Sequence, residues 1–186
     1  EVDFVFFMDT SGSMLQYYQA VVQSMLAFAR ANAQNPKVRF AVVGVPYPTE
    51  SVCGLISNFE DAIGIQPIFT AIGNLPYSFG QEPTFDCPYI AVQAHNPLGL
   101  NFRPTASKVF ISFSDEYGHS FFMPELEAPA VGAALSAAGV KFHSFSLPGD
   151  GMTSFKPMVD ATHGFEFNLA QPADNLAADL LSLLSA

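Results

Sequence analysis

Continuous apolar segments of strand length alternate with segments of helical periodicity along most of the chain. Residues 2–8 (VDFVFFM) form one such apolar run, which ends abruptly in the polar stretch Asp-Thr-Ser-Gly-Ser. Continuous rather than alternating hydrophobicity is typical of a strand that is buried on both faces of a parallel sheet. Residues 16–33 have apolar positions at helical spacing, and residues 38–45 form the next apolar run. This order of strand, helix and strand predicts a βαβ unit.

The same alternation returns in the second half of the chain, after an irregular middle. In that middle, we predict a short edge strand at 51–59, a short helix at 62–72 that Pro67 interrupts, and a long loop at 74–87. Long loops inside compact domains are usually functional. The remaining predicted elements are a short helix at 88–95, strands at 107–114, 141–147 and 165–169, and helices at 129–138, 153–162 and 172–184.

These elements predict a three-layer α/β/α sandwich with a mostly parallel central sheet and one short antiparallel edge strand. The 186 residues are 49% hydrophobic, which is enough for one well-packed core, so we expect a single domain over residues 1–186. Because the sequence opens directly in a strand-like segment, we expect that domain to be a part of a longer protein. No apolar run reaches the roughly 18 to 20 residues of a membrane span, so we expect no insertion into a membrane.

The charge of the chain disfavours some classes of binding partner. Only 13% of the residues are charged, and 7 Lys and Arg against 17 Asp and Glu give a formal net charge of -10. A phosphate backbone needs a cationic surface, so neither nucleic acid nor an anionic membrane surface is an expected partner. A surplus of carboxylates favours a bound cation instead.

Two predicted strands end in carboxylates, where open α/β sheets bind their ligands. Asp9 follows the first strand, Asp115 follows the strand at 107–114, and Ser11 and Ser13 alternate with Asp9 along one tight turn. All four side chains carry hard oxygen donors, which suit Mg²⁺, Ca²⁺ or Mn²⁺ better than zinc. The alternative is that these residues only cap the helices that follow them.

The segment VDFVFFMDTSGSM resembles the opening of a von Willebrand factor A (VWA) domain, whose Asp-x-Ser-x-Ser turn begins the metal-ion-dependent adhesion site (MIDAS). The stretch NFRPTASKVFISFSDEYGHS resembles a branch of secreted bacterial VWA proteins, and KPMVDATHGFEFNL is similar to a late helix-to-strand stretch of the family. The resemblance implies a divalent cation, most simply Mg²⁺, held by Asp9, Ser11, Ser13 and Asp115. Thr84 by residue type, or Asp86 by alignment, is the implied last ligand.

Several other side chains are candidates for the surroundings of that site. Four aromatic residues of the irregular middle could line a ligand groove or fill a loop core, and His119 could lie at the rim of the site. The four aromatic residues are Tyr77, Phe79, Phe85 and Tyr89. A hydrolase is disfavoured because the chain has no Gly-x-Ser-x-Gly elbow, and the Asp-Thr-Ser-Gly-Ser turn lacks the Gly-Lys end of a phosphate-binding loop.

Cys53 and Cys87 are the only cysteines, and both lie in the irregular middle. They could form one disulfide, which would restrict a long loop, or remain two buried free thiols. A disulfide would favour an oxidising compartment.

We therefore expect a binding module without enzymatic activity, found at a cell surface, in the periplasm or outside the cell. The resemblance implies a protein partner that presents Asp or Glu, whose carboxylate completes the metal shell. The alternative is a structural scaffold in which any cation only steadies the loops.

Overall fold

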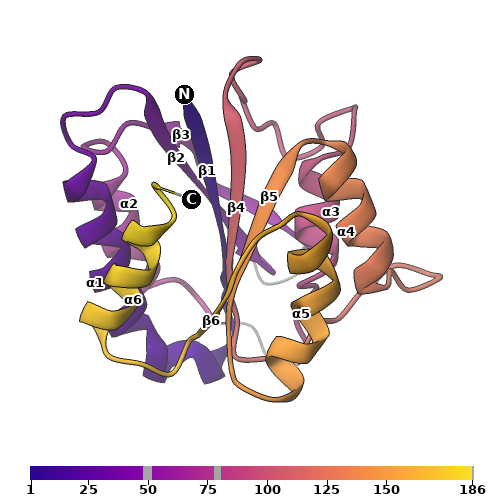
Figure 1. Ribbon diagram of the computed structural model, residues 1–186. Coiled ribbons are helices and arrows are strands. Elements are labelled where there is room, and N and C mark those ends of the chain that lie inside the picture. Colours follow the sequence, from indigo (N-terminus) through magenta and orange to yellow (C-terminus); the bar gives the residue numbers. More distant parts are fainter. Residues whose placement is uncertain (48–51, 78–80, 186) are drawn as a thin grey trace.

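The computed structural model describes residues 1–47, 52–77 and 81–185, and it places six strands in one central sheet (Figure 1). The strands follow the order β3-β2-β1-β4-β5-β6, and every pairing is parallel except that of the edge strand β3 with β2. The strands are β1 (Val2–Asp9), β2 (Val38–Val45), β3 (Gly54–Glu60), β4 (Ser107–Phe113), β5 (Val140–Ser146) and β6 (Glu166–Asn168). The predicted sheet, including its antiparallel edge strand, is confirmed.

Helices cover both faces of this sheet, so the predicted three-layer architecture is also confirmed (Figure 1). The helices of one face are α1 (Leu15–Ala31), α2 (Gln66–Ile72) and α6 (Ala173–Ser182), with the short 3-10 helix η1 (Gly12–Met14) before α1. The helices of the other face are α3 (Asp86–Ala91), α4 (Ala128–Ala137) and α5 (Asp150–Ala161). Parallel strands alternating with helices direct the carboxyl ends of β1, β4 and β5 to one edge of the sheet, at the bottom of Figure 1. We name this the C-terminal edge and the opposite one the N-terminal edge.

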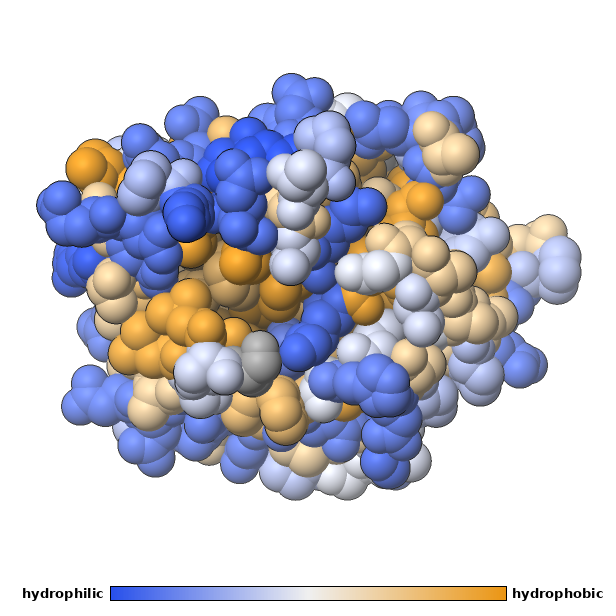
Figure 2. All heavy atoms as spheres, turned by 45° about the horizontal axis from the view of Figure 1, so that its top comes forward, coloured by the Kyte–Doolittle hydropathy of each residue, from blue (hydrophilic) through white to orange (hydrophobic). Residues whose placement is uncertain are grey.

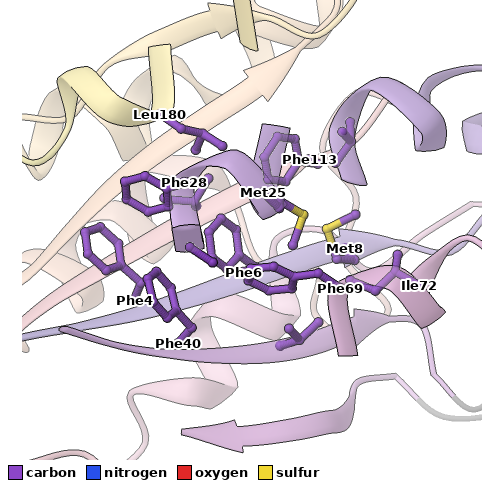
Figure 3. Packing of buried hydrophobic residues seen from close by; sticks show 14 of the residues in the cluster. Phe4, Phe6, Met8, Met25, Phe28, Phe40, Phe69, Ile72, Phe113 and Leu180 are labelled. Carbon is purple, nitrogen blue, oxygen red and sulfur yellow. The ribbon is translucent and has the colours of Figure 1, made fainter. Parts of the chain in front are cut away.

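Phenylalanine rings dominate the core between the sheet and the α1 face (Figure 3). Phe6 of β1 packs edge-on against Phe69 of α2 at 5.3 Å between ring centroids, and Phe4 packs edge-on against Phe28 of α1 at 5.1 Å. Alternate residues of β1 point to opposite faces, so Val5 and Phe7 belong to the second core. Burial on both faces explains why β1 is apolar at nearly every position.

Two predicted features of the irregular middle need correction. Pro67 does not interrupt a helix, because it lies in the first turn of α2, where a missing backbone N–H costs nothing. The predicted loop 74–87 ends earlier, because α3 begins at Asp86 rather than at residue 88. A proline in the first turn therefore marks a helix start in both cases.

Cys53 and Cys87 form a disulfide, which confirms the predicted pairing. It joins the start of the edge-strand region to α3 across 34 residues of sequence, with 5.5 Å between the Cα atoms. Cys87 is fully buried against the second core.

A Cys53→Ser/Cys87→Ser double variant should lose about 3 to 4 kcal/mol of unfolding free energy, because its unfolded chain gains the entropy of an open loop of this length. Guanidinium denaturation followed by circular dichroism measures the loss. Reduction of the wild-type protein should reproduce it, and the double variant should not respond to reductant. Equal unfolding curves for oxidised and reduced wild-type protein would contradict this expectation.

Candidate metal centre at the C-terminal edge

The first part of the site is the turn that follows β1. Asp9 ends the strand with only 1% of its surface exposed, and its two carboxylate oxygens accept different hydrogen bonds. One oxygen accepts the backbone N–H of Ser11 at 2.8 Å, and the other accepts the hydroxyl of Ser114 at 2.6 Å. The first bond folds the turn back on the strand end, and the second ties it to the end of β4.

Hydroxyl groups continue this network to the second carboxylate. The Ser11 and Ser13 hydroxyl oxygens lie 2.9 Å apart, and Ser13 donates to Asp115 at 3.0 Å. The contact forms because β1 and β4 are neighbours in the sheet and end at the same edge. The structure therefore brings Asp9, Ser11, Ser13 and Asp115 together, with Asp9 buried and Ser13 open to solvent.

Glu82 is a further acidic residue at this place, and the sequence did not single it out. It is fully buried, and both of its carboxylate oxygens lack a hydrogen-bond partner among the described residues. Burial, together with the nearby charges of Asp9, Glu116 and Asp115, raises the pKa of Glu82 to about 8. A buried carboxylate without a partner is costly, so Glu82 requires a proton or a cation here.

The pKa of Asp9 is also raised, for the same physical reasons. Its pKa is raised to about 6, because burial and the charge of Asp115 outweigh the hydrogen bonds from Ser11 and Ser114 that favour the charged form. Two carboxyl groups with raised pKa values beside a third carboxylate fit a bound cation, since a cation would stabilise the charged form of all of them.

The donor set is mixed. Within residues 1–47, 52–77 and 81–185, no group of three or more His, Cys, Asp and Glu side chains is close enough together to hold a metal ion. The arrangement consequently fits a hard cation only if the serine hydroxyls act as ligands together with the carboxylates, which is chemistry suited to Mg²⁺ or Ca²⁺.

The two alternatives for the last ligand have other roles in the structure. The Thr84 hydroxyl accepts the backbone N–H of His119 at 3.0 Å. The Asp86 carboxylate accepts the Ser120 hydroxyl and the backbone N–H of Phe121, both at 2.6 Å. Both Asp86 oxygens therefore fix the loop after β4, and a ligand role for Thr84 or Asp86 stays a prediction.

Two of the four aromatic residues predicted to line a groove pack against other aromatic rings. Phe85 is buried and packs edge-on against Phe155 at 5.8 Å, so it fills the second core, and Tyr89 lies against Phe122. Tyr77 is 37% exposed, and Phe79 lies outside the described residues.

His119 lies on the loop after β4, with its ring 4.3 Å from that of Tyr117. Two exposed apolar side chains that the sequence analysis missed follow ligand positions closely along the chain. Leu15 is 48% exposed and follows Ser13 by two residues, and Tyr117 is 50% exposed and follows Asp115 by two residues. Exposed apolar side chains near a polar centre are typical of a protein-binding surface.

The fold is that of a VWA domain. The chain is similar to proximal thread matrix protein 1 from the mussel byssus, with a TM-score of 0.72 and 17% identity over 98% of this chain and 45% of that one. It is also similar to the SpRpn10 VWA domain (TM-score 0.69, 13% identity, 98% of this chain and 94% of that one). A third similar structure is the pilus adhesin SpaC from Lactobacillus rhamnosus GG (TM-score 0.67, 15% identity, 99% of this chain and 29% of that one).

This chain spans about half the length of the mussel protein. Another structure of that protein has a zinc-occupied MIDAS motif, with a TM-score of 0.73 and 17% identity over 99% of this chain and 45% of that one. Neither models of protein families nor curated proteins gave a match. Among the described residues, no helix has the length and apolar character needed to cross a membrane.

Proposed function

We propose that this domain binds a protein partner through a divalent cation held at the C-terminal edge. Asp9, Ser11, Ser13 and Asp115 are the proposed ligands, and Glu82 adds a further carboxylate beside the ion. The observation that carries the proposal is the buried Glu82 carboxylate, which has no hydrogen-bond partner in the part of the chain that the structure describes and lies within the electrostatic reach of Asp9 and Asp115. A structural residue of this kind would be expected to have hydrogen bonds.

The partner supplies an Asp or Glu carboxylate to the cation. Ser13 is exposed and Asp115 is half-buried, so the outer side of the proposed site faces solvent, whereas Asp9 closes its inner side. The half-exposed Leu15 and Tyr117 would then contact the partner around the ion. Such an interface uses the metal for specificity and apolar side chains for affinity.

The proposed role is binding without catalysis, in an extracellular, cell-surface or periplasmic protein. The disulfide supports an oxidising compartment. The similar mussel byssus protein with a zinc-occupied MIDAS and the similar pilus adhesin support a cation-dependent binding role. The competing function is a scaffold whose cation only steadies the loops.

Asp9→Asn should abolish the rise in melting temperature that Mg²⁺, Ca²⁺ or Mn²⁺ gives to the wild-type protein. The substitution keeps the volume of a buried side chain while it removes the charge that the cation needs. A cation at about 100 times its dissociation constant stabilises the wild-type protein by about 2.7 kcal/mol, and differential scanning fluorimetry in chelator and in each cation measures this shift.

Asp174→Asn is the matched control, because Asp174 is exposed in the first turn of α6 at the same edge and belongs to no proposed ligand set. It should retain the cation-induced shift. An undiminished shift in Asp9→Asn would remove the site assignment. Acetate at high concentration should change the cation-induced shift of the wild-type protein if the ion has an open position, and no effect of acetate would favour the scaffold.

A further inference from the structure

Six of the seven Lys and Arg side chains lie at the N-terminal edge of the sheet. All seven Lys and Arg are among the described residues, and only Lys156 lies away from the N-terminal edge, where it pairs with Asp160 at 2.9 Å. The other six are Arg30, Lys37, Arg39, Arg103, Lys108 and Lys141. Hydrophilic residues gather over the upper part of this edge in Figure 2, which brings the top of Figure 1 forward.

The C-terminal edge has several carboxylates, and none of the seven Lys and Arg side chains, all of which are described, lies there. Besides Glu82, the acidic residues at this edge include Asp9, Asp115, Glu116, Glu125, Glu127 and Asp150. A divalent cation would cancel only two of these negative charges. A partner surface with acidic groups alone would therefore be repelled, and a partner with basic groups around its ligand acid would be attracted.

One hollow at this edge has the chemistry to hold such a basic group. It has a volume of about 250 Å³ and is lined by Tyr117, Asp150, Thr153 and Ser154. Asp150 is exposed at the start of α5 and takes part in none of the ion pairs of the described residues. The hollow therefore offers a carboxylate and an aromatic ring that are both open to solvent.

Hydrogen bonds fix the wall of this hollow. The Ser154 hydroxyl donates to the carbonyl of Gly151 at 2.7 Å and accepts the backbone N–H of Gly118 at 2.8 Å. The second bond holds the loop that carries Tyr117 against α5. The His119 ring lies against Tyr117, so the tyrosine is supported on one side. A ring and a carboxylate held in this way are prepared to receive a cationic side chain.

We propose that the hollow of Tyr117, Asp150, Thr153 and Ser154 binds an Arg or Lys side chain of the protein partner, beside the partner acid that completes the cation shell. This inference rests on the proposed function for the acid, but the basic-residue pocket exists without the cation. Arginine fits best, since its planar guanidinium can stack on the Tyr117 ring while it donates hydrogen bonds to Asp150.

The pocket can be tested alone with N-ethylguanidinium, an analogue of the arginine side chain, in the presence of chelator. Titration followed by ¹H–¹⁵N NMR should give saturable shifts centred on the amides of Tyr117 and Thr153. Asp150→Asn should remove these shifts, and Asp174→Asn should retain them. Shifts spread over the acidic edge, or unchanged in Asp150→Asn, would overturn the inference. This holds whether or not the protein binds a cation at the proposed site.

The complete site can be tested with fluorescein-labelled peptides that carry one Arg and one Asp, joined by Gly-Ser linkers of increasing length. With Mg²⁺ present, the peptide of best linker length should bind about 3- to 10-fold more tightly than its citrulline counterpart, which lacks the charge. Asp150→Asn and Tyr117→Ala should remove this difference, and Asp174→Asn should preserve it.

Two outcomes separate the pocket from the proposed function. Equal affinity of the Arg and citrulline peptides at every linker length would overturn the basic-residue pocket while leaving cation-dependent binding intact. An Arg peptide that binds equally well in chelator, or after its Asp is changed to Asn, would contradict a partner carboxylate bound to the cation, as the proposed function requires. Neither result would contradict the basic-residue pocket.

Discussion

Glu82→Gln should stabilise the metal-free protein by about 2 to 3 kcal/mol at a pH above about 8, where the wild-type protein must keep an unpartnered carboxylate buried. Burial and nearby charges raise the pKa of Glu82 from 4.5 to about 8 in the folded protein. The folded state therefore holds the proton more tightly than the unfolded state. Stability from this group is fully present below the unfolded pKa and is lost as the pH rises through the folded one, and glutamine avoids that loss.

Guanidinium denaturation in chelator, at one pH near 5 and another above 8, measures the effect. Wild-type protein should be less stable at the higher pH by an amount that Glu82→Gln largely removes. Glu125→Gln is the matched control, because Glu125 is an exposed carboxylate at the same edge, and it should keep the wild-type dependence. Identical pH dependence in Glu82→Gln and wild-type protein would show that Glu82 has an unrecognised partner.

The same substitution should act in the opposite direction on cation binding. Removal of one carboxylate beside the ion should weaken Mg²⁺ or Ca²⁺ binding, so the cation-induced rise in melting temperature should fall in Glu82→Gln. A residue that costs stability in the metal-free protein and strengthens ion binding is kept for function rather than for folding. This pair of opposite effects would place the cation beside Glu82.

The fold was predictable where burial dictates the pattern. β1, β2 and β4 lie in the middle of the sheet, so both of their faces are apolar, and the resulting runs are visible in the sequence. The region between β2 and β4 was harder to interpret. β3 is an edge strand whose seven residues are half-buried or exposed, which leaves no continuous apolar run. α2 has only seven residues, too few for a clear helical period.

The site was predictable to the same extent. Asp9, Ser11, Ser13 and Asp115 follow two apolar strands directly, so their meeting at one edge follows from the parallel sheet. Glu82 lies on a loop whose position does not follow from the pairing of the strands. Its significance comes from its burial and from the lack of a hydrogen-bond partner among residues 1–47, 52–77 and 81–185, neither of which a sequence displays. Asp86 matched a ligand position by alignment, although its oxygens bond to the loop around Ser120.

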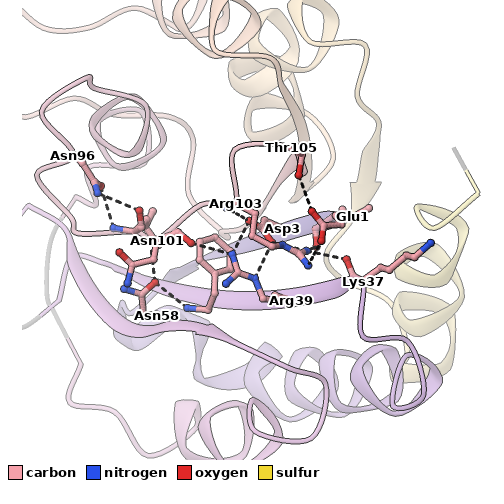
Figure 4. Close-up of polar contacts among 12 residues, drawn as sticks. Glu1, Asp3, Lys37, Arg39, Asn58, Asn96, Asn101, Arg103 and Thr105 are labelled. Atoms are coloured by element: carbon pink, nitrogen blue, oxygen red, sulfur yellow. Dashed lines mark hydrogen bonds and ion pairs between the residues drawn. The ribbon is translucent and has the colours of Figure 1, made fainter.

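The N-terminal edge has its own buried carboxylate, but this one has partners (Figure 4). Asp3 accepts hydrogen bonds from the Arg39 guanidinium at 2.9 and 3.1 Å and from the backbone N–H of Arg103 at 2.8 Å. The Arg103 guanidinium also donates to the carbonyls of Val2 and Lys37, which fastens the segment before β4 to the starts of β1 and β2. Burial raises the pKa of Asp3, but hydrogen bonds and charges from the two arginines outweigh it and lower the pKa overall.

Asp3→Asn should therefore cost about 3 to 5 kcal/mol of unfolding free energy at neutral pH, because it leaves two partly buried arginines without their shared carboxylate. Urea denaturation measures the loss, and Asp160→Asn, which breaks only the exposed pair with Lys156, should change stability by less than about 0.5 kcal/mol. Since the folded pKa of Asp3 is lowered, its contribution is present above the unfolded pKa and disappears as the pH falls through the folded one. The difference between wild-type protein and Asp3→Asn should accordingly shrink in acid. A loss as small as that of Asp160→Asn would mean that the arginines find other partners and that this edge is not fastened through Asp3.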